Sequence, residues 1–400
     1  MKEVRRATVC AALGLALVLG ISTLAAAEDL NVHWKTGVRG QSEDKAFSFK
    51  WGGRIMVDFG WVDVDEALDD PEDPLEDWVE FRRARLFVEG LIYENIEFKA
   101  QYDFGGGEAA FKDVYLGIKT PGPFSGIRIG HFKQPFSLEE QTSSKYITLM
   151  ERSPLNEAFT PGRDTGLMAH GHALDERMTY AFGVFRPADD FGEFQGDEYA
   201  ITGRVTGLVV DRDNTLVHVG GALSHAEAPD DELRFRARPS AHGMTRLVNT
   251  DHFEADSTRL YGLEAAAVFG PASVQGEYII ADVDSAEGGD PQFHGWYVEA
   301  SWFITGESRP YKKSTGAFDR VKPHQNLGEN GGFGAVQLTA RYSTLDLNDG
   351  TIEGGEMDDI AVGVNWYLNP NTRIMLNYVN ADVAGEGEAN IFEMRFQIDW

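Results

Sequence analysis

Apolar and polar residues alternate along short segments of this chain from about residue 47 to its last residue. In residues 96–104, apolar and aromatic side chains alternate with Glu97, Lys99, Gln101 and Asp103. The same period of two returns in many later segments, among them 296–304, 336–342, 360–368 and 392–400. A period of two is typical of β-strands with one apolar and one polar face. The pattern therefore predicts an all-β protein.

The alternating segments and the turn residues between them predict sixteen strands. We expect strands to begin near residues 47, 78, 95, 110, 126, 163, 178, 198, 215, 257, 273, 294, 333, 357, 372 and 389. Successive antiparallel strands then place short turns at one end and longer loops at the other. The connection 306–332 is long although it falls at the short-turn end, and we expect it to form a folded, plug-like turn.

Cationic residues inside these segments decide between a soluble sheet and a membrane barrel. A Lys or Arg that faced lipid at the bilayer midplane would cost about 2–4 kcal/mol, so Lys99, Arg204 and Arg341 must face inward. The last segment ends on its apolar face at Trp400, as outer-membrane barrels do. In lipid, an all-β chain must close on itself to satisfy its backbone. We predict a 16-stranded antiparallel transmembrane β-barrel with long inward-folding loops, in the outer membrane of a Gram-negative bacterium.

The first residues are typical of an export signal. A basic start is followed by an apolar run over residues 7–24 and by three alanines at 25–27, a small-residue cleavage site. We therefore expect a signal peptide at 1–27 and one barrel domain at 28–400; a retained membrane anchor is the alternative. Cys10 is the one cysteine of the chain and lies in the signal, so disulfides are not expected to stabilise the barrel.

The formal net charge of −28 argues against nucleic acid as a partner. It does not identify what a pore would pass, because charges in loops and charges at a constriction act differently. The sequence gives no reason to expect a cofactor or a metal: His170 and His172 share a strand face but lack a third ligand nearby. We expect no enzymatic activity, since no spacing brings a nucleophile and a base together.

Three basic groups are candidates for binding anions. Arg234, Arg236 and Arg238 would project to one side of an extended segment, about 6.6–6.8 Å apart. Such a stripe would attract anions if its loop folds into the lumen. Bridges to the neighbouring acidic residues 230–232, or a solvated loop, are the alternatives.

The second group contains Arg82, Arg83 and Arg85, for which pairing with acidic residues on a neighbouring strand is the alternative. The third accompanies the long connection after the fifth strand. It comprises Arg128, Lys133, Ser143, Ser144, Lys145 and Arg152. Hydroxyls beside cations supply the donors that a dehydrated oxyanion needs, and an inward loop of this kind narrows a barrel. A loop that only caps the barrel mouth is the alternative.

Several ordered motifs resemble the phosphate-selective porin O and P family. They are Phe81-Arg82-Arg83-Ala84-Arg85, the stretch 130–136, Thr142-Ser143-Ser144, Glu151-Arg152-Ser153, residues 162–166, Arg236-Ala237-Arg238-Pro239 and residues 306–311. The resemblance implies trimeric 16-stranded channels in which an arginine ladder, here Arg234, Arg236 and Arg238, leads to a narrow anion site. Ser143, Ser144 and Arg152 would lie near that constriction.

One departure from the family pattern bears on the transported ion. Phosphate-specific members use lysines near the narrow site, whereas this chain has Leu138-Glu139-Glu140-Gln141 there, and carboxylates would repel phosphate. We expect passive uptake of phosphate or related oxyanions, with a general or organic-anion porin as the alternative. A barrel-type hydrolase or a structural barrel is the alternative of another class. Expected partners are small anions such as inorganic phosphate, outer-membrane lipid and lipopolysaccharide, and two further copies of the chain in a homotrimer.

Overall fold

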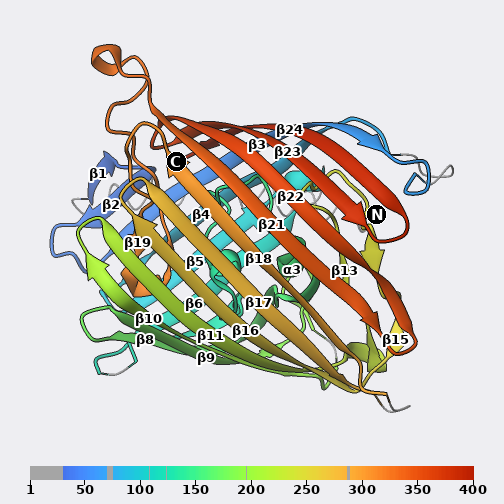
Figure 1. Cartoon of the computed structure of the whole chain (residues 1–400). Coiled ribbons are helices and arrows are strands. Elements are labelled where there is room, and N and C mark those ends of the chain that lie inside the picture. The colour runs from blue at the N-terminus through green and yellow to red at the C-terminus, as the bar shows by residue number, and fades with distance from the viewer. Residues whose placement is uncertain (1–29, 70–74, 108, 123, 195, 286–288) are drawn as a thin grey trace, which may run out of the picture.

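A computed structural model describes residues 30–400 except 70–74, 108, 123, 195 and 286–288 (Figure 1). Within these residues, sixteen strands pair in antiparallel order and the last pairs with the first, which closes the barrel. The barrel strands are β3 (Ser48–Val64), β4 (Trp78–Ile92), β5 (Ile96–Asp103), β6 (Ala110–Lys119), β7 (Gly126–Lys133), β8 (Arg163–Ala173), β9 (Met178–Arg186), β10 (Ala200–Arg212), β11 (Thr215–Glu227), β16 (Ser257–Phe269), β17 (Ala272–Asp284), β18 (Gln292–Phe303), β21 (Ala335–Asp349), β22 (Ile352–Asn369), β23 (Thr372–Val383) and β24 (Gly387–Asp399). The predicted signal peptide at 1–27 lies outside the described residues.

The predicted sixteen-stranded fold is confirmed. Most strands begin within two residues of the expected position; β22 begins five residues earlier, at Ile352. Closure joins β24 to β3 with Phe392 opposite Trp61 and Asp399 opposite Arg54. Beyond the last strand, the Trp400 amide donates to the Gly53 carbonyl at 3.0 Å. No helix among the described residues is long and apolar enough to cross a membrane.

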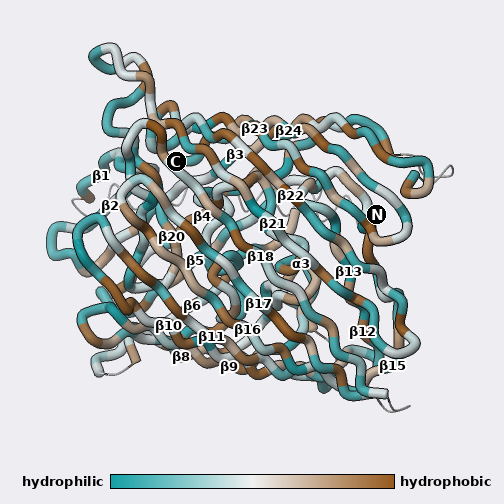
Figure 2. The backbone as a smooth tube through the Cα atoms, viewed as in Figure 1, coloured by the Kyte–Doolittle hydropathy of each residue, from teal (hydrophilic) through white to brown (hydrophobic). Residues whose placement is uncertain are grey.

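The strand faces follow the predicted assignment. On β21, Leu338 and Tyr342 are exposed on the outer surface, whereas Arg341 between them is buried at 2% exposure. Arg204 on β10 is likewise buried on the inner side. Hydropathy alternates along the strands, and the loops at both ends are largely hydrophilic (Figure 2). The barrel therefore presents an apolar exterior and a polar interior.

A short hairpin precedes the barrel and was not predicted. It consists of β1 (Leu30–Trp34) and β2 (Val38–Ser42). β2 pairs with residues 48–51 of β3, on the edge that β24 occupies further along. The hairpin therefore continues the pairing of β3 where β24 ends. Both chain ends of the described barrel lie at this end, which we call the terminal end; the opposite one is the far end.

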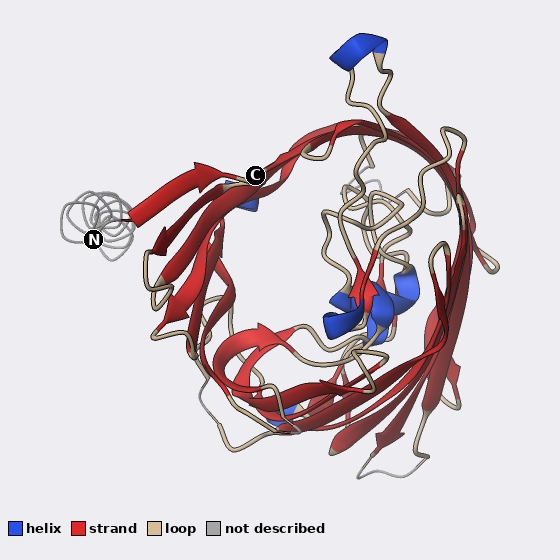
Figure 3. Ribbon diagram, turned by 90° about the vertical axis from the view of Figure 1, so that its left-hand side faces the viewer, coloured by secondary structure: helices blue, strands red, loops and turns tan. Residues whose placement is uncertain are grey.

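The third loop of the far end (residues 134–162) folds into the barrel (Figure 3). It contains α2 (Leu138–Gln141) and α3 (Pro154–Phe159). Ser137 caps α2 by accepting a hydrogen bond from the Glu140 amide at 3.0 Å. Glu277 of β17 accepts from the amides of Leu138 and Glu139 at 3.0 and 2.7 Å. This wall carboxylate therefore holds the start of α2 in place.

The fifth loop (residues 228–256) also folds inward and rests on the third. It contains four two-residue strands, β12 (Glu232–Leu233), β13 (Arg236–Ala237), β14 (Val248–Asn249) and β15 (Phe253–Glu254). Phe235 packs edge to face on Phe159 of the third loop, with ring centroids 5.5 Å apart. Ser240 donates to Asp359 of β22 at 2.6 Å.

The returning loop (residues 304–334) accounts for the long connection at the terminal end. Its β19 (Tyr311–Lys312) and β20 (Ala317–Phe318) lie inside the barrel mouth. Arg204 of β10 donates to the Gly316 carbonyl at 2.9 Å, and the Phe318 amide donates to Thr142 of the third loop at 3.4 Å. Residues 329–331 project away from the barrel (Figure 3). Loops from both ends therefore meet in the lumen, as expected for a plug-like turn.

Candidate functional site

A β-bulge brings two consecutive arginines to the inner face of β4. Met56 of β3 lies opposite Arg83, but Asp58 lies opposite Glu80, so β4 has one extra residue in this interval. A bulge of this kind re-aims side chains locally. As a result Phe81 is exposed outside, while Arg82 and Arg83 both reach into the lumen.

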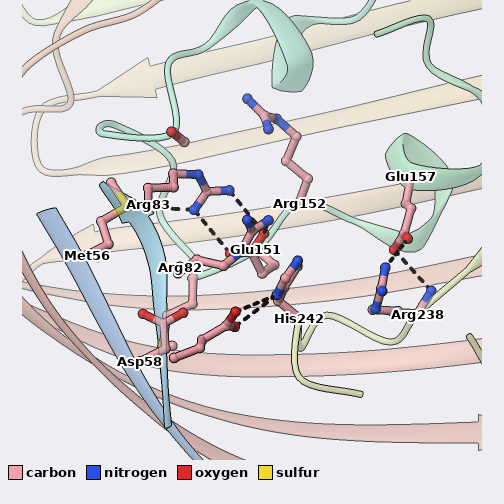
Figure 4. Close-up of polar contacts among 12 residues, drawn as sticks. Met56, Asp58, Arg82, Arg83, Glu151, Arg152, Glu157, Arg238 and His242 are labelled. Carbon is pink, nitrogen blue, oxygen red and sulfur yellow. Dashed lines mark hydrogen bonds and ion pairs between the residues drawn. The ribbon is translucent and has the colours of Figure 1, made fainter. Parts of the chain in front are cut away.

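Arg82 and Arg83 converge on Glu151 of the third loop (Figure 4). Arg82 makes two hydrogen bonds of 2.9 Å to its carboxylate, and Arg83 makes two of 3.2 Å. Arg395 of β24 adds a contact of 2.6 Å and also binds Asp58. Burial alone would raise the pKa of Glu151, but the three guanidiniums hold it well below its usual range. We call Arg82, Arg83, Arg395 and Glu151 the arginine clasp.

A second carboxylate of the third loop neutralises two predicted constriction cations. Glu140 lies 2.7 Å from Lys133 and 3.1 Å from Arg152. Burial opposes its ionisation, but Arg152 and Lys133 lower the pKa of Glu140 to about 2. Arg152 also donates to the carbonyls of Glu139 and Thr142 at 3.0 Å each, so it holds the loop together.

The two carboxylates of α2 were expected from the sequence to repel an anion, but in the structure both are ion-paired. Glu139 accepts a hydrogen bond of 2.8 Å from Arg341 of the wall and one of 2.7 Å from Ser153. Glu140 is bound to its two cations. Each carboxylate is ion-paired and no more than 11% exposed, so its charge is largely neutralised before an anion arrives.

Two further predicted cations pair with carboxylates of the wall. Arg85 contacts Asp103 of the neighbouring strand at 2.6 Å, which is the alternative considered for this group. Arg128 contacts Glu97 at 2.6 Å near the terminal end, away from the third loop. Ser143 accepts a long hydrogen bond of 3.5 Å from the Lys145 amide, within its own loop.

The part of the third loop nearest the terminal end carries a cluster with more cations than carboxylates. Lys145 lies 3.6 Å from Asp399 of β24, and Arg54 of β3 donates to Ser144 at 2.7 Å. Arg320 of the returning loop also pairs with Asp399. Lys50, two positions before Gly52 on the same face of β3, contributes a further positive charge. We call Lys50, Arg54, Lys145, Arg320 and Asp399 the terminal cluster.

Electrostatic repulsion within the terminal cluster acts on Lys145. Burial, followed by repulsion from Arg54, lowers the pKa of Lys145 to about 7, although Asp399 opposes the shift. The sequence analysis missed Arg54, Lys50 and Arg320. The alternation on β3 places the first two on the lumen face and was the available signal; Arg320 depends on how the returning loop folds.

The arginines of the fifth loop form another basic group, and the loop folds inward as the ladder hypothesis requires. Arg238 lies 2.7 Å from Glu157 of α3, and Arg246 shares the same carboxylate at 3.3 Å. Arg234 lies 3.6 Å from the exposed Asp251. Partial burial and the repulsion of the other three arginines lower the pKa of Arg246. The carboxylates that pair with Arg234 and Arg238 are thus not the acidic residues 230–232 proposed as the alternative.

Arg236 completes this group, and no carboxylate among the described residues lies within ion-pair distance of it. We call Arg234, Arg236, Arg238 and Arg246 the fifth-loop arginines.

Buried arginines of the wall hold the backbone of the third loop. Arg373 donates to the Ile147 carbonyl at 2.8 Å, and Arg395 donates to the Met150 carbonyl at 2.6 Å. Arg341 donates to the Glu151 carbonyl at 3.2 Å. The sequence analysis placed Arg341 on the inner face but did not anticipate this role, because the loop path is a tertiary feature.

Comparison with known proteins identifies the family. Residues 49–400 match the model of phosphate-selective porin O and P. The chain belongs to this porin family. An uncharacterized protein of Caulobacter vibrioides is 31% identical over 88% of this chain and 72% of its own. Porin O of Pseudomonas aeruginosa is 26% identical over 88% of this chain and 87% of its own.

Solved porins share the fold at low sequence identity. The anion-selective porin from Comamonas acidovorans has a TM-score of 0.54 at 13% identity and covers 88% of this chain and 100% of its own. The trimer form of OmpT from Vibrio cholerae has a TM-score of 0.57 at 13% identity and covers 89% and 100%. The protein is thus an outer-membrane porin of a Gram-negative bacterium, and the family indicates a channel rather than an enzyme. The terminal end of a porin barrel faces the periplasm.

Proposed function

We propose that this porin is an anion-selective channel for the passive uptake of phosphate or related oxyanions. It catalyses no reaction, and ions move down their own gradient. The family description and the relationship to Porin O support this assignment.

The terminal cluster is the observation that carries the proposal. Three cations, Arg54, Arg320 and Lys50, act on Lys145, and one carboxylate, Asp399, opposes them. The cluster lies where the third loop and the returning loop approach β3 and β24. A net positive charge in a narrow, partly dehydrated zone attracts anions and excludes cations.

The fifth-loop arginines extend this field toward the far end. Together they contact Glu157 and Asp251 as carboxylates, which leaves positive charge in excess. Their guanidiniums stay charged at all physiological pH values. An anion entering from outside would meet these arginines before it reaches the third loop, as in a ladder.

Planar-bilayer recordings of the purified protein test the proposal. In a KCl gradient, we expect a reversal potential of the sign set by chloride, despite the acidic chain. Inorganic phosphate added to KCl should reduce the chloride current if the site favours oxyanions. Chloride selectivity without phosphate competition would support the general or organic-anion porin instead. A cation-selective reversal potential would refute the anion assignment and leave the barrel unaffected.

We further propose that residues 1–27 are removed on export and that the mature barrel, residues 28–400, assembles as a homotrimer in contact with lipid and lipopolysaccharide. The signal-like composition supports the cleavage, and the trimer form of a structural neighbour supports the assembly. Amino-terminal sequencing of protein from outer membranes and its native mass in detergent test these points. A chain beginning at residue 1, or a monomeric mass, would contradict them.

A further inference from the structure

The arginine clasp is built like an oxyanion site, but its occupant is a side chain of the protein. Arg82 and Arg83 bind Glu151 through four hydrogen bonds of 2.9–3.2 Å, and Arg395 adds one of 2.6 Å. Paired guanidinium forks of this kind match the geometry of both carboxylate and phosphate. Among the described residues, Glu151 is the one carboxylate in ion-pair contact with Arg82 and Arg83.

The clasp is also within reach of the lumen. The side chain of Arg82 is 19% exposed and that of Glu151 is 12% exposed, whereas Arg395 is fully buried. On β24, Arg395 precedes Asp399 of the terminal cluster by four residues on the same inward face. An oxyanion that moves along the lumen toward the terminal cluster would therefore pass beside the clasp.

We propose that Glu151 is a tethered competitor of the permeating oxyanion: it occupies the guanidiniums of Arg82 and Arg83 and so keeps oxyanion binding weak. The inference rests on the proposed anion channel and adds a residue that sets its affinity. A channel must release its ion quickly, so a site in which Arg82 and Arg83 had no carboxylate partner would bind an oxyanion too tightly for conduction. The loop carboxylate lowers that affinity at a fixed position.

Removal of the competitor tests the proposal. Glu151→Ala removes both the charge and the side-chain volume, whereas Glu151→Gln removes the charge and keeps the volume. In single-channel recordings, we expect the phosphate concentration that halves the chloride current to fall about tenfold in the alanine variant and less in the glutamine variant. Glu176→Gln, at an exposed turn, makes the same charge change outside the lumen and should match the wild type.

The outcomes separate this inference from the proposed function. A wild-type reversal potential that favours cations would reject the channel assignment itself. Anion selectivity in all proteins, with an unchanged or higher half-blocking phosphate concentration in both Glu151 variants, would reject the competitor role alone. The decisive quantity is therefore the ratio of the half-blocking phosphate concentrations of the variant and the wild type, rather than the absolute current.

Refolding provides a second measurement if the alanine variant does not fold in chloride. Loss of Glu151 leaves Arg82 and Arg83 without an ion partner, and buried unpaired charges destabilise a fold. We expect inorganic phosphate to restore folded, heat-resistant barrel at millimolar concentrations where chloride does not. Equal recovery, or equal failure, in phosphate and chloride would overturn the proposal.

Discussion

The arginine clasp and the terminal cluster are two basic regions of one lumen that differ in how far carboxylates neutralise their cations. In the clasp, Glu151 binds Arg82 and Arg83 and shares Arg395 with Asp58. In the terminal cluster, Lys145 and Arg320 pair with Asp399, and Arg54 and Lys50 add positive charge beside them. Both regions use the same types of side chain, but only the terminal cluster leaves a large excess of positive charge.

The difference shows that a count of lumen cations does not measure anion selectivity. A cation paired with a buried carboxylate mainly holds the third loop in place, whereas cations that outnumber the carboxylates around them leave positive charge to act on an ion in the pore. Lys133 and Arg152 belong to the first kind because both bind Glu140. Lys145 belongs to the second kind, because Arg54, Arg320 and Lys50 also act on it and Asp399 is its one ion-pair partner among the described residues.

The largest expected effect concerns the cations that are paired with Glu140. Glu140→Gln leaves Lys133 and Arg152 buried without their carboxylate, which should destabilise the third loop by about 3 kcal/mol. Hydrogen exchange of residues 138–142 should then accelerate about 100-fold, with Glu176→Gln as the control. Unchanged exchange would mean that Glu140 does not hold the loop.

The ion pairs of Glu140 also predict that the third loop loses stability at acidic pH. The pKa of Glu140 is about 2 in the folded protein, against 4.5 for an ordinary glutamate in the unfolded chain. The stability that ionised Glu140 gives to the third loop is therefore fully present above pH 4.5 and is lost as the pH falls toward 2. Protection of the wild-type loop should decline in this range, and the Glu140→Gln variant should lose this part of the decline. Equal acid profiles of the two proteins would contradict the assignment.

The next effect concerns the cations of the terminal cluster, which outnumber their carboxylate. Lys145→Glu places a second carboxylate beside Asp399, so the ratio of anion to cation permeability should fall about tenfold. Reversal potentials in a KCl gradient measure the ratio. Lys35→Glu, on the exposed turn of the amino-terminal hairpin, makes the same charge change outside the lumen. A ratio equal to that of this control would place Lys145 outside the ion path.

A smaller effect is expected for the fifth loop. Replacing Arg234, Arg236 and Arg238 together with Ala should lower anion conductance a few-fold at 0.01 M salt and little at 1 M, because the screening length falls from about 30 to 3 Å. Ala at the exposed Lys35, Lys119 and Arg212 is the matched control. If conductance at low salt does not change, these arginines do not guide ions.

The smallest effect is a pH dependence. Lys145, whose pKa is about 7, is charged below this pH and neutral above it, so anion conductance should fall by less than about twofold between pH 6 and 8. An anion beside Lys145 offsets the repulsion and favours its protonated form, so phosphate should shift the midpoint upward. Lys145→Gln should abolish the step; a step that survives would belong to another group.

Much of the fold could be predicted from the sequence because it depends on local alternation. The period of two placed Leu338 and Tyr342 outside and Arg341 inside, and the cost of a cation in lipid allowed no other assignment. The hairpin at residues 30–42 escaped prediction because its second strand, Val38-Arg39-Gly40-Gln41-Ser42, has no apolar face. The candidate site was predicted less well, because most of its cations act through partners far away in the chain.

The sequence by itself determined a closed barrel with an apolar exterior and determined which strand residues face the lumen, since lipid imposes that choice at every second position. Only the tertiary structure decided which lumen cations keep their charge available. The bulge that turns both Arg82 and Arg83 inward arises where β3 pairs with β4. The path of the third loop then brings Glu151 to them across 69 and 68 residues of chain. Charge balance in a pore depends on such long-range pairing, because attraction between ions is set by distance in space and not by spacing along the chain.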